Sequence, residues 1–149
     1  MAESIRGRLP ELRRELHRYP EPGWCEFYTT HRLVEELRDL DVDELRVGPE
    51  AYDPDDRMAI PPDDRLDEWF DRARERGADP DLLETMAGGN TGVVAVADRG
   101  EGPSIGLRVD IDGLFIEESA AADHLPAAEG FRSETGETMH ACGHDAHMT

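Results

Sequence analysis

The densest group of side chains that could do chemistry lies in the last ten residues of this 149-residue chain. Positions 140–147 read HACGHDAH and contain three histidines, one cysteine and one aspartate. Thiolate sulfur and imidazole nitrogen are ligands for borderline divalent metals such as Zn, Mn, Co or Ni. Cys142 and His144 are two positions apart, so an extended loop turns both toward one side, and Gly143 lets the backbone adapt. The pattern predicts a metal site in this loop, where Asp145 is suited to orient an imidazole.

Two other interpretations of the same residues stay open. His140, His144 and His147 fall at i, i+4 and i+7, which is one face of a helix. On that interpretation the three rings form a solvated polar stripe or an accidental nickel-binding patch. A further alternative treats Cys142 as a redox thiol, because neighbouring histidines favour a reactive thiolate.

A second candidate is the segment LRVDIDGL at positions 107–114. Asp110 and Asp112 alternate just past an expected strand, so they share a face, where carboxylates can act in catalysis or orient a ligand. The plainer interpretation is that an aspartate after a strand caps a turn. A third segment, RRELHRYPE at positions 13–21, reads as the charged, solvated face of an amphipathic helix.

Apolar spacing and turn signals predict the elements that position these side chains. Helices are expected over 5–19, with Ser4 as N-cap, over 27–40, over 66–76, capped by Asp63 or Asp64, and over 80–86, opened by Asp79. A short strand is expected over 43–47. Two apolar strands, 92–97 and 104–109, are joined by a tight turn and predict a hairpin in a mostly buried sheet. Together these elements indicate one domain of the α/β or α+β class.

Composition excludes several classes of protein. The chain has 35 acidic residues against 16 basic ones, all of them arginine, and a net charge of −19. Nucleic acid is not expected as a partner, because phosphate binding needs a cationic surface. No apolar run is long enough to span a membrane, and the first residues lack a signal peptide, so a cytoplasmic protein is expected. The acidity and the absence of lysine favour a halophilic, haloarchaeal source; the alternative is that GC-rich codons favour arginine.

Three segments, taken in order, resemble the M20 family of metal-dependent amidohydrolases and peptidases. They are positions 13–21, 108–114 and 139–147, and the block MHACGHD in the last is highly specific. Positions 23–27, 56–61 and 87–95 are similar to the branch of the family that acts on aminobenzoyl-glutamate. The long insertion between positions 47 and 89 also favours that branch.

The resemblance implies a zinc-peptidase-like α/β catalytic domain, with a mixed sheet flanked by helices, that carries an inserted dimerisation domain. It implies two divalent metal ions, most often Zn or Mn, and a glutamate as general base. Cys142 and His144 then resemble the first metal ligands, and Asp110 resembles an orienting carboxylate. Four further residues are candidates to orient those ligands: Asp112, His140, Asp145 and His147.

In the family, the catalytic glutamates, two more histidine ligands and the inserted domain follow later in the chain. We therefore expect residues 1–149 to be an incomplete N-terminal portion of the catalytic domain, inactive alone. The implied substrate is an N-acyl or aminobenzoyl amino acid, and the implied partner is a second hydrolase subunit or another copy. The alternatives are a non-catalytic metal-binding or interaction protein, a remnant of a broken gene, and a piece that pairs with a separately encoded one.

Overall fold

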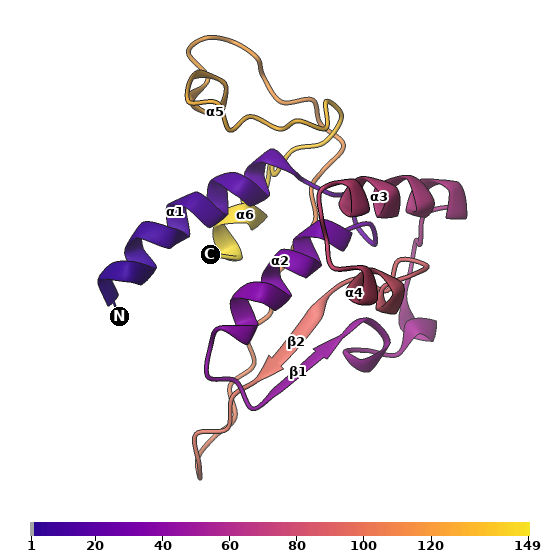
Figure 1. The fold of residues 1–149 in the computed structure, drawn as a ribbon, viewed down its shortest axis with the longest axis vertical. Coiled ribbons are helices and arrows are strands. Elements are labelled where there is room, and N and C mark those ends of the chain that lie inside the picture. Colours follow the sequence, from indigo (N-terminus) through magenta and orange to yellow (C-terminus); the bar gives the residue numbers. More distant parts are fainter. Residues whose placement is uncertain (1) are drawn as a thin grey trace. The chain divides into compact units, whose positions relative to one another are not determined.

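The computed structural model describes the backbone of residues 2–149 and the side chains of residues 7–149. It is mostly helical and has one small sheet (Figure 1). By the clustering of its internal contacts the chain divides into two compact units. We call Trp24–Arg108 the middle unit, and the chain up to Gly23 together with Val109–Thr149 the terminal unit. None of the described helices is long and apolar enough to cross a membrane.

Three helices and the sheet form the middle unit. The helices are α2 (Phe27–Arg38), α3 (Asp63–Glu75) and α4 (Pro80–Thr85), and the strands are β1 (Glu44–Val47) and β2 (Val93–Val96). Helix α2 packs against all of these elements because one of its faces is buried. Phe27 and Trp69 are fully buried, and the Phe27 ring meets the edge of Phe70 at 5.5 Å. Two short 3₁₀ turns, η1 (Gly48–Glu50) and η2 (Pro54–Asp56), lie between the sheet and α3.

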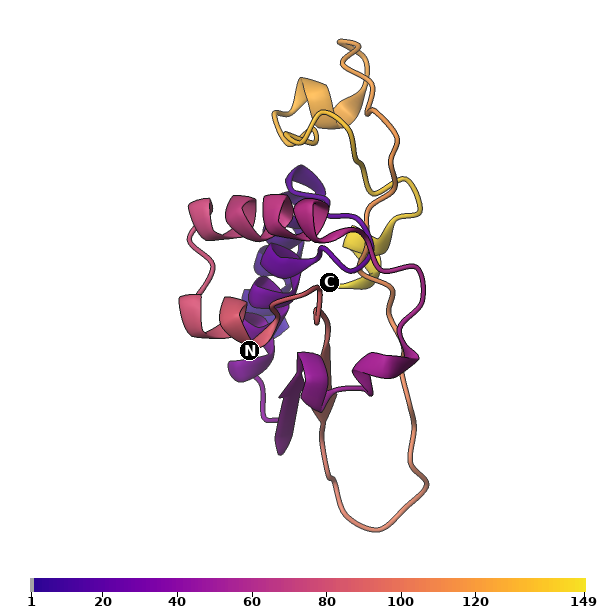
Figure 2. The ribbon, with the colours of Figure 1, turned by 90° about the vertical axis from the view of Figure 1, so that its right-hand side faces the viewer.

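The predicted hairpin is wrong. Strand β2 pairs antiparallel with β1, with Val93 opposite Val47 and Val96 opposite Glu44. Residues 104–109 form no strand and belong to an open loop that runs on from β2 (Figure 2). Ile105 is 90% exposed and Leu107 is 88% exposed, so the apolar pattern of this segment has no partner among the described residues. An apolar run forms a strand only where a second edge can share its backbone hydrogen bonds.

The helix boundaries confirm four predicted helices and correct two predicted caps. The Asp79 carboxylate accepts the Leu82 N–H at 2.9 Å, as expected for the cap of α4. Helix α3 starts after Pro62, so Asp63 and Asp64 lie inside its first turn, where their charge favours the helix dipole. Helix α1 (Ala2–Arg18) starts before Ser4, which is therefore not its N-cap.

The terminal unit is built on α1. Leu16 on this helix is fully buried, and the ring of Phe131, from the loop that carries the short α5 (Leu125–Ala128), is buried in the same unit. The short α6 (His144–His147) packs beside α1 (Figure 1). Gly113 passes so close to the chain after α1 that a Cβ there would lie 2.8 Å from Pro20 Cβ. The unit therefore brings both ends of the described chain together with the segment that follows residue 109.

Candidate metal site and its charge network

The candidate metal loop turns sharply just before α6. Gly143 has a φ of +76°, a conformation that favours glycine, and its N–H bonds to the His140 carbonyl at 3.1 Å. Cys142 is exposed and makes no disulfide, whereas His144 is largely covered. Cys25, the other cysteine, is buried in the middle unit, as its apolar neighbours in sequence indicated.

The structure brings two of the sequence candidates together at His144. Its Nδ1 lies 2.8 Å from the Asp112 carbonyl oxygen and 3.2 Å from Asp112 Oδ1. Both neighbours are acceptors, so Nδ1 carries the proton and Nε2 keeps the lone pair. This is the tautomer in which a histidine binds a metal through Nε2 while a backbone carbonyl fixes its ring. Asp112 follows no strand, contrary to expectation, and acts through its backbone as much as through its carboxylate.

The histidines do not form one helical stripe. His140 precedes α6 and is buried, 5% exposed, and neither of its ring nitrogens has a hydrogen-bond partner among the described residues. Burial lowers the pKa of His140 to about 4, so its ring is neutral near pH 7. His147 is exposed, and its ring centroid lies 5.9 Å from that of His144. Asp110 is exposed one residue past the start of this part of the terminal unit.

Asp145 is fully buried and faces α1. Its Oδ2 accepts from His17 Nδ1 at 3.0 Å and from Arg13 Nε at 3.1 Å. Burial would raise the pKa of Asp145, but the hydrogen bond and charge of His17 and the charge of Arg13 hold it below its usual value. Asp145 therefore contacts an imidazole, but that of His17 and not one in the metal loop.

Glu118 completes a network that the sequence did not indicate. It is buried, and its Oε1 lies 2.8 Å from His17 Nε2 and 2.8 Å from His124 Nε2. The Ser133 N–H donates to Oε2 at 2.6 Å. Burial would raise the pKa of Glu118, and these donors outweigh burial and lower it.

His17 joins the two carboxylates. Both of its ring nitrogens face an ionised acceptor, so both donate and the ring is an imidazolium. Burial opposes that charge, but the bonds to Asp145 and Glu118 outweigh it and raise the pKa of His17. The available signal was that His17 follows Leu16 on the apolar stripe of α1; Glu118 had no comparable signal.

The donor chemistry of the loop fits part of a metal site. A thiol and an imidazole held in its Nδ1–H tautomer suit Zn, Co or Mn, but Zn sites normally have three or four ligands. Among the residues that the structure describes, no three His, Cys, Asp or Glu side chains are close enough to hold an ion. Cys142 and His144 can therefore supply only a partial ligand set.

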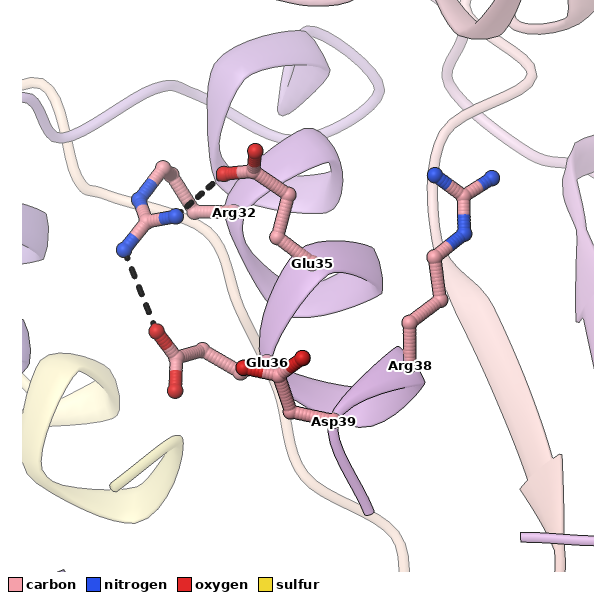
Figure 3. A pocket seen from close by; sticks show the side chains of 5 residues that line it. All are labelled: Arg32, Glu35, Glu36, Arg38 and Asp39. Atoms are coloured by element: carbon pink, nitrogen blue, oxygen red, sulfur yellow. Dashed lines mark hydrogen bonds and ion pairs between the residues drawn. The ribbon is translucent and has the colours of Figure 1, made fainter.

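A pocket on α2 offers no competing site (Figure 3). Its lining is charged and lies on the last turns of one helix: Arg32, Glu35, Glu36, Arg38 and Asp39. Arg32 pairs with Glu35 and, at 3.2 Å, with Glu36, as expected for charges three and four residues apart. This is the salt-bridged surface of a helix.

Known proteins similar to this chain are hydrolases by name. Indole-3-acetyl-aspartic acid hydrolase from Enterobacter agglomerans is 45% identical over 149 residues, which is 97% of this chain and 34% of that protein. One of the subunits of p-aminobenzoyl-glutamate hydrolase from Escherichia coli is 40% identical over 145 residues, covering 97% of this chain and 33% of that protein. Hippurate hydrolase from Campylobacter jejuni is 27% identical and covers 98% of this chain.

A solved structure agrees. The aminobenzoyl-glutamate utilization protein from Klebsiella pneumoniae superposes with a TM-score of 0.70 at 37% identity, over 75% of this chain and 28% of that one. No protein-family model matches the sequence. The fold and the similar sequences together place the chain among metal-dependent amide hydrolases. It belongs to the M20 amidohydrolase family, and it spans about a third of the length of the curated relatives that it matches best.

Proposed function

We propose that this chain is the part of an M20 amidohydrolase that supplies the first metal ligands, Cys142 and His144. The observation that carries the proposal is the Asp112 carbonyl 2.8 Å from His144 Nδ1, which leaves Nε2 free to bind a metal two residues after an exposed thiol. The proposed reaction is hydrolysis of the amide bond of an N-acyl or aminobenzoyl amino acid. The names of the similar hydrolases support that substrate class.

Each residue of the site has a proposed role. Cys142 binds as the thiolate and His144 binds through Nε2, while Asp112 holds the proton on His144 Nδ1. Asp110 is proposed as a carboxylate that orients the site. The divalent ions, Zn or Mn, supply a polarised amide carbonyl and a bound water of lowered pKa when present.

The rest of the proposed enzyme lies outside these residues. We propose that residues 1–149 form part of a zinc-peptidase-like α/β catalytic domain, supported by the TM-score of 0.70. Further ligands and the general-base glutamate would come from residues beyond this chain, because two donors do not complete a site. A second hydrolase subunit is a proposed partner, because the similar Escherichia coli protein is by name one of several subunits.

Cobalt binding tests the ligand assignment. Co²⁺ added to the purified chain should produce a thiolate-to-cobalt charge-transfer absorption, with weak affinity. Cys142→Ala should abolish the band and His144→Gln should weaken it. Cys25→Ala removes the other thiol, in the middle unit, and should leave the band intact. A band that survives Cys142→Ala would refute the assignment.

Hydrolysis tests the proposed incompleteness. Aminobenzoyl-glutamate and N-acetyl amino acids are incubated with the chain in the presence of Mn²⁺ or Zn²⁺. We expect no turnover, because the ligand set is partial. Robust turnover that Cys142→Ala abolishes would show that the chain assembles a complete site by itself.

A further inference from the structure

The turn that presents the candidate ligands has little support of its own. Helix α6 contains four residues, and a helix this short is not stable without tertiary contacts. Two side-chain anchors hold it: His144 bonds to Asp112, and Asp145 bonds to α1. The direction of the His144 ring therefore depends on what holds Asp145.

His17 is the buried anchor of Asp145. Arg13, the other partner, has a side chain that is 49% exposed, so solvent competes for its bond. The His17 side chain is almost fully covered and bonds to Asp145 through Nδ1. Because its Nε2 bonds to Glu118 on the opposite side, the ring cannot rotate without breaking two buried contacts.

We propose that His17 is a positioning residue of the candidate metal site, clamped by Glu118 so that its Nδ1–H fixes Asp145 and, through α6, the orientation of His144. This inference rests on the proposed function of Cys142 and His144. It separates His17 from general packing in α1, which Leu16 and Phe131 provide.

Two variants of similar size separate positioning from packing. In His17→Asn the side-chain amide can take the place of Nδ1–H and keep a donor to Asp145. In His17→Gln the amide can take the place of Nε2–H and keep a donor to Glu118 only. If His17 acts through Asp145, the asparagine variant should rescue the site and the glutamine variant should not.

The first measurement needs no metal. Long-range ¹H–¹⁵N spectra of the labelled chain report which ring nitrogen of each histidine carries a proton. In the wild type we expect both His17 nitrogens to be protonated, and His144 to be protonated at Nδ1 alone. His17→Asn should keep the single tautomer of His144, and His17→Gln should give a mixture.

The second measurement is the affinity for Co²⁺, read from the thiolate band. We expect His17→Gln to weaken binding by about 10-fold or more, as for other residues that orient metal ligands, and His17→Asn to weaken it less. His31→Gln is the control, because His31 is a buried histidine of the middle unit. It should leave both readouts unchanged.

Each outcome decides the matter. The proposal is wrong if wild-type His144 is already a mixture of tautomers, or if the two His17 variants lose tautomer and affinity equally, including by unfolding of the terminal unit. If wild type gives no thiolate band, the proposed function fails, while the tautomer comparison still tests whether His17 orients His144.

Discussion

Three buried ionisable side chains determine where charge lies in the terminal unit. Glu118 and Asp145 remain ionised because histidine, arginine and backbone donors replace the water that they lose. His17 remains charged because it lies between them. Such a network stabilises the fold only while it is complete, since removal of one member leaves the others buried without a partner.

Removing the charge of Glu118 should therefore be costly. Glu118→Gln keeps the size of the side chain but cannot balance His17, and we expect the free energy of unfolding to fall by about 3 kcal/mol. Urea denaturation followed by circular dichroism measures this. The neighbouring Glu117 has a side chain that is 79% exposed, so Glu117→Gln should change stability by less than about 0.5 kcal/mol. Equal effects of the two variants would contradict a buried network.

His140 should make the chain less stable in mild acid. Its pKa is about 4 when folded, below the roughly 6.5 of an exposed histidine, so the unfolded chain binds a proton first as the pH falls. Its contribution to stability is present above pH 6.5 and is lost toward pH 4, by up to about 1.4 kcal/mol per pH unit. The raised pKa of His17 acts in the opposite direction, since its contribution is lost as the pH rises.

A variant isolates the His140 effect from the others. Urea denaturation between pH 7 and pH 5 should show a smaller loss of stability in His140→Leu than in the wild type. His147→Gln changes an exposed histidine of the same loop and should keep the wild-type slope. A His140→Leu slope equal to that of the wild type would show that His140 is not a source of the pH dependence.

At the scale of elements, local signals decided the helices and pairing decided the strands. Helix α4 begins where Asp79 and Pro80 predict, because the cap acts within one turn. Strand β2 has the same kind of apolar pattern as residues 104–109, yet only β2 lies beside β1. A strand is defined by its neighbour, and the sequence pattern alone does not say which neighbour is present.

The α4 cap provides a test at this scale. Asp79→Ala removes the acceptor of the Leu82 N–H and should lower the free energy of unfolding by about 1 kcal/mol. Thermal denaturation of this variant and of Glu84→Ala, an exposed change in the same helix, gives the comparison. If both variants match the wild type, the cap does not stabilise α4.

At the scale of the whole molecule, the dominant property is a net charge of −19. Like charges repel over about 10 Å in 0.1 M salt and over about 3 Å in 1 M salt. Many arginines pair within one helix turn, as Arg72 does with Glu68 at 2.5 Å, but acids outnumber bases about two to one. The folded chain therefore carries uncompensated repulsion that screening should relieve.

Salt should stabilise the chain. We expect the midpoint of thermal unfolding to rise between 0.1 M and 1 M KCl, because screening reduces repulsion in the compact state. A sucrose solution of equal osmolality serves as the uncharged control. A midpoint that does not rise, or that rises equally in sucrose, would contradict the electrostatic explanation and weaken the inference of a halophilic source.

The sequence by itself determined the family, the four longer helices and the metal loop, since each depends on residues close together in the chain. The block MHACGHD and the cap at Asp79 are signals of this kind. Only the tertiary structure decided that β1 is the partner of β2, that Asp112 holds His144, and that His17 lies between Glu118 and Asp145. Those contacts join residues 32 to 128 positions apart, and no local pattern records which distant side chains folding will bring together.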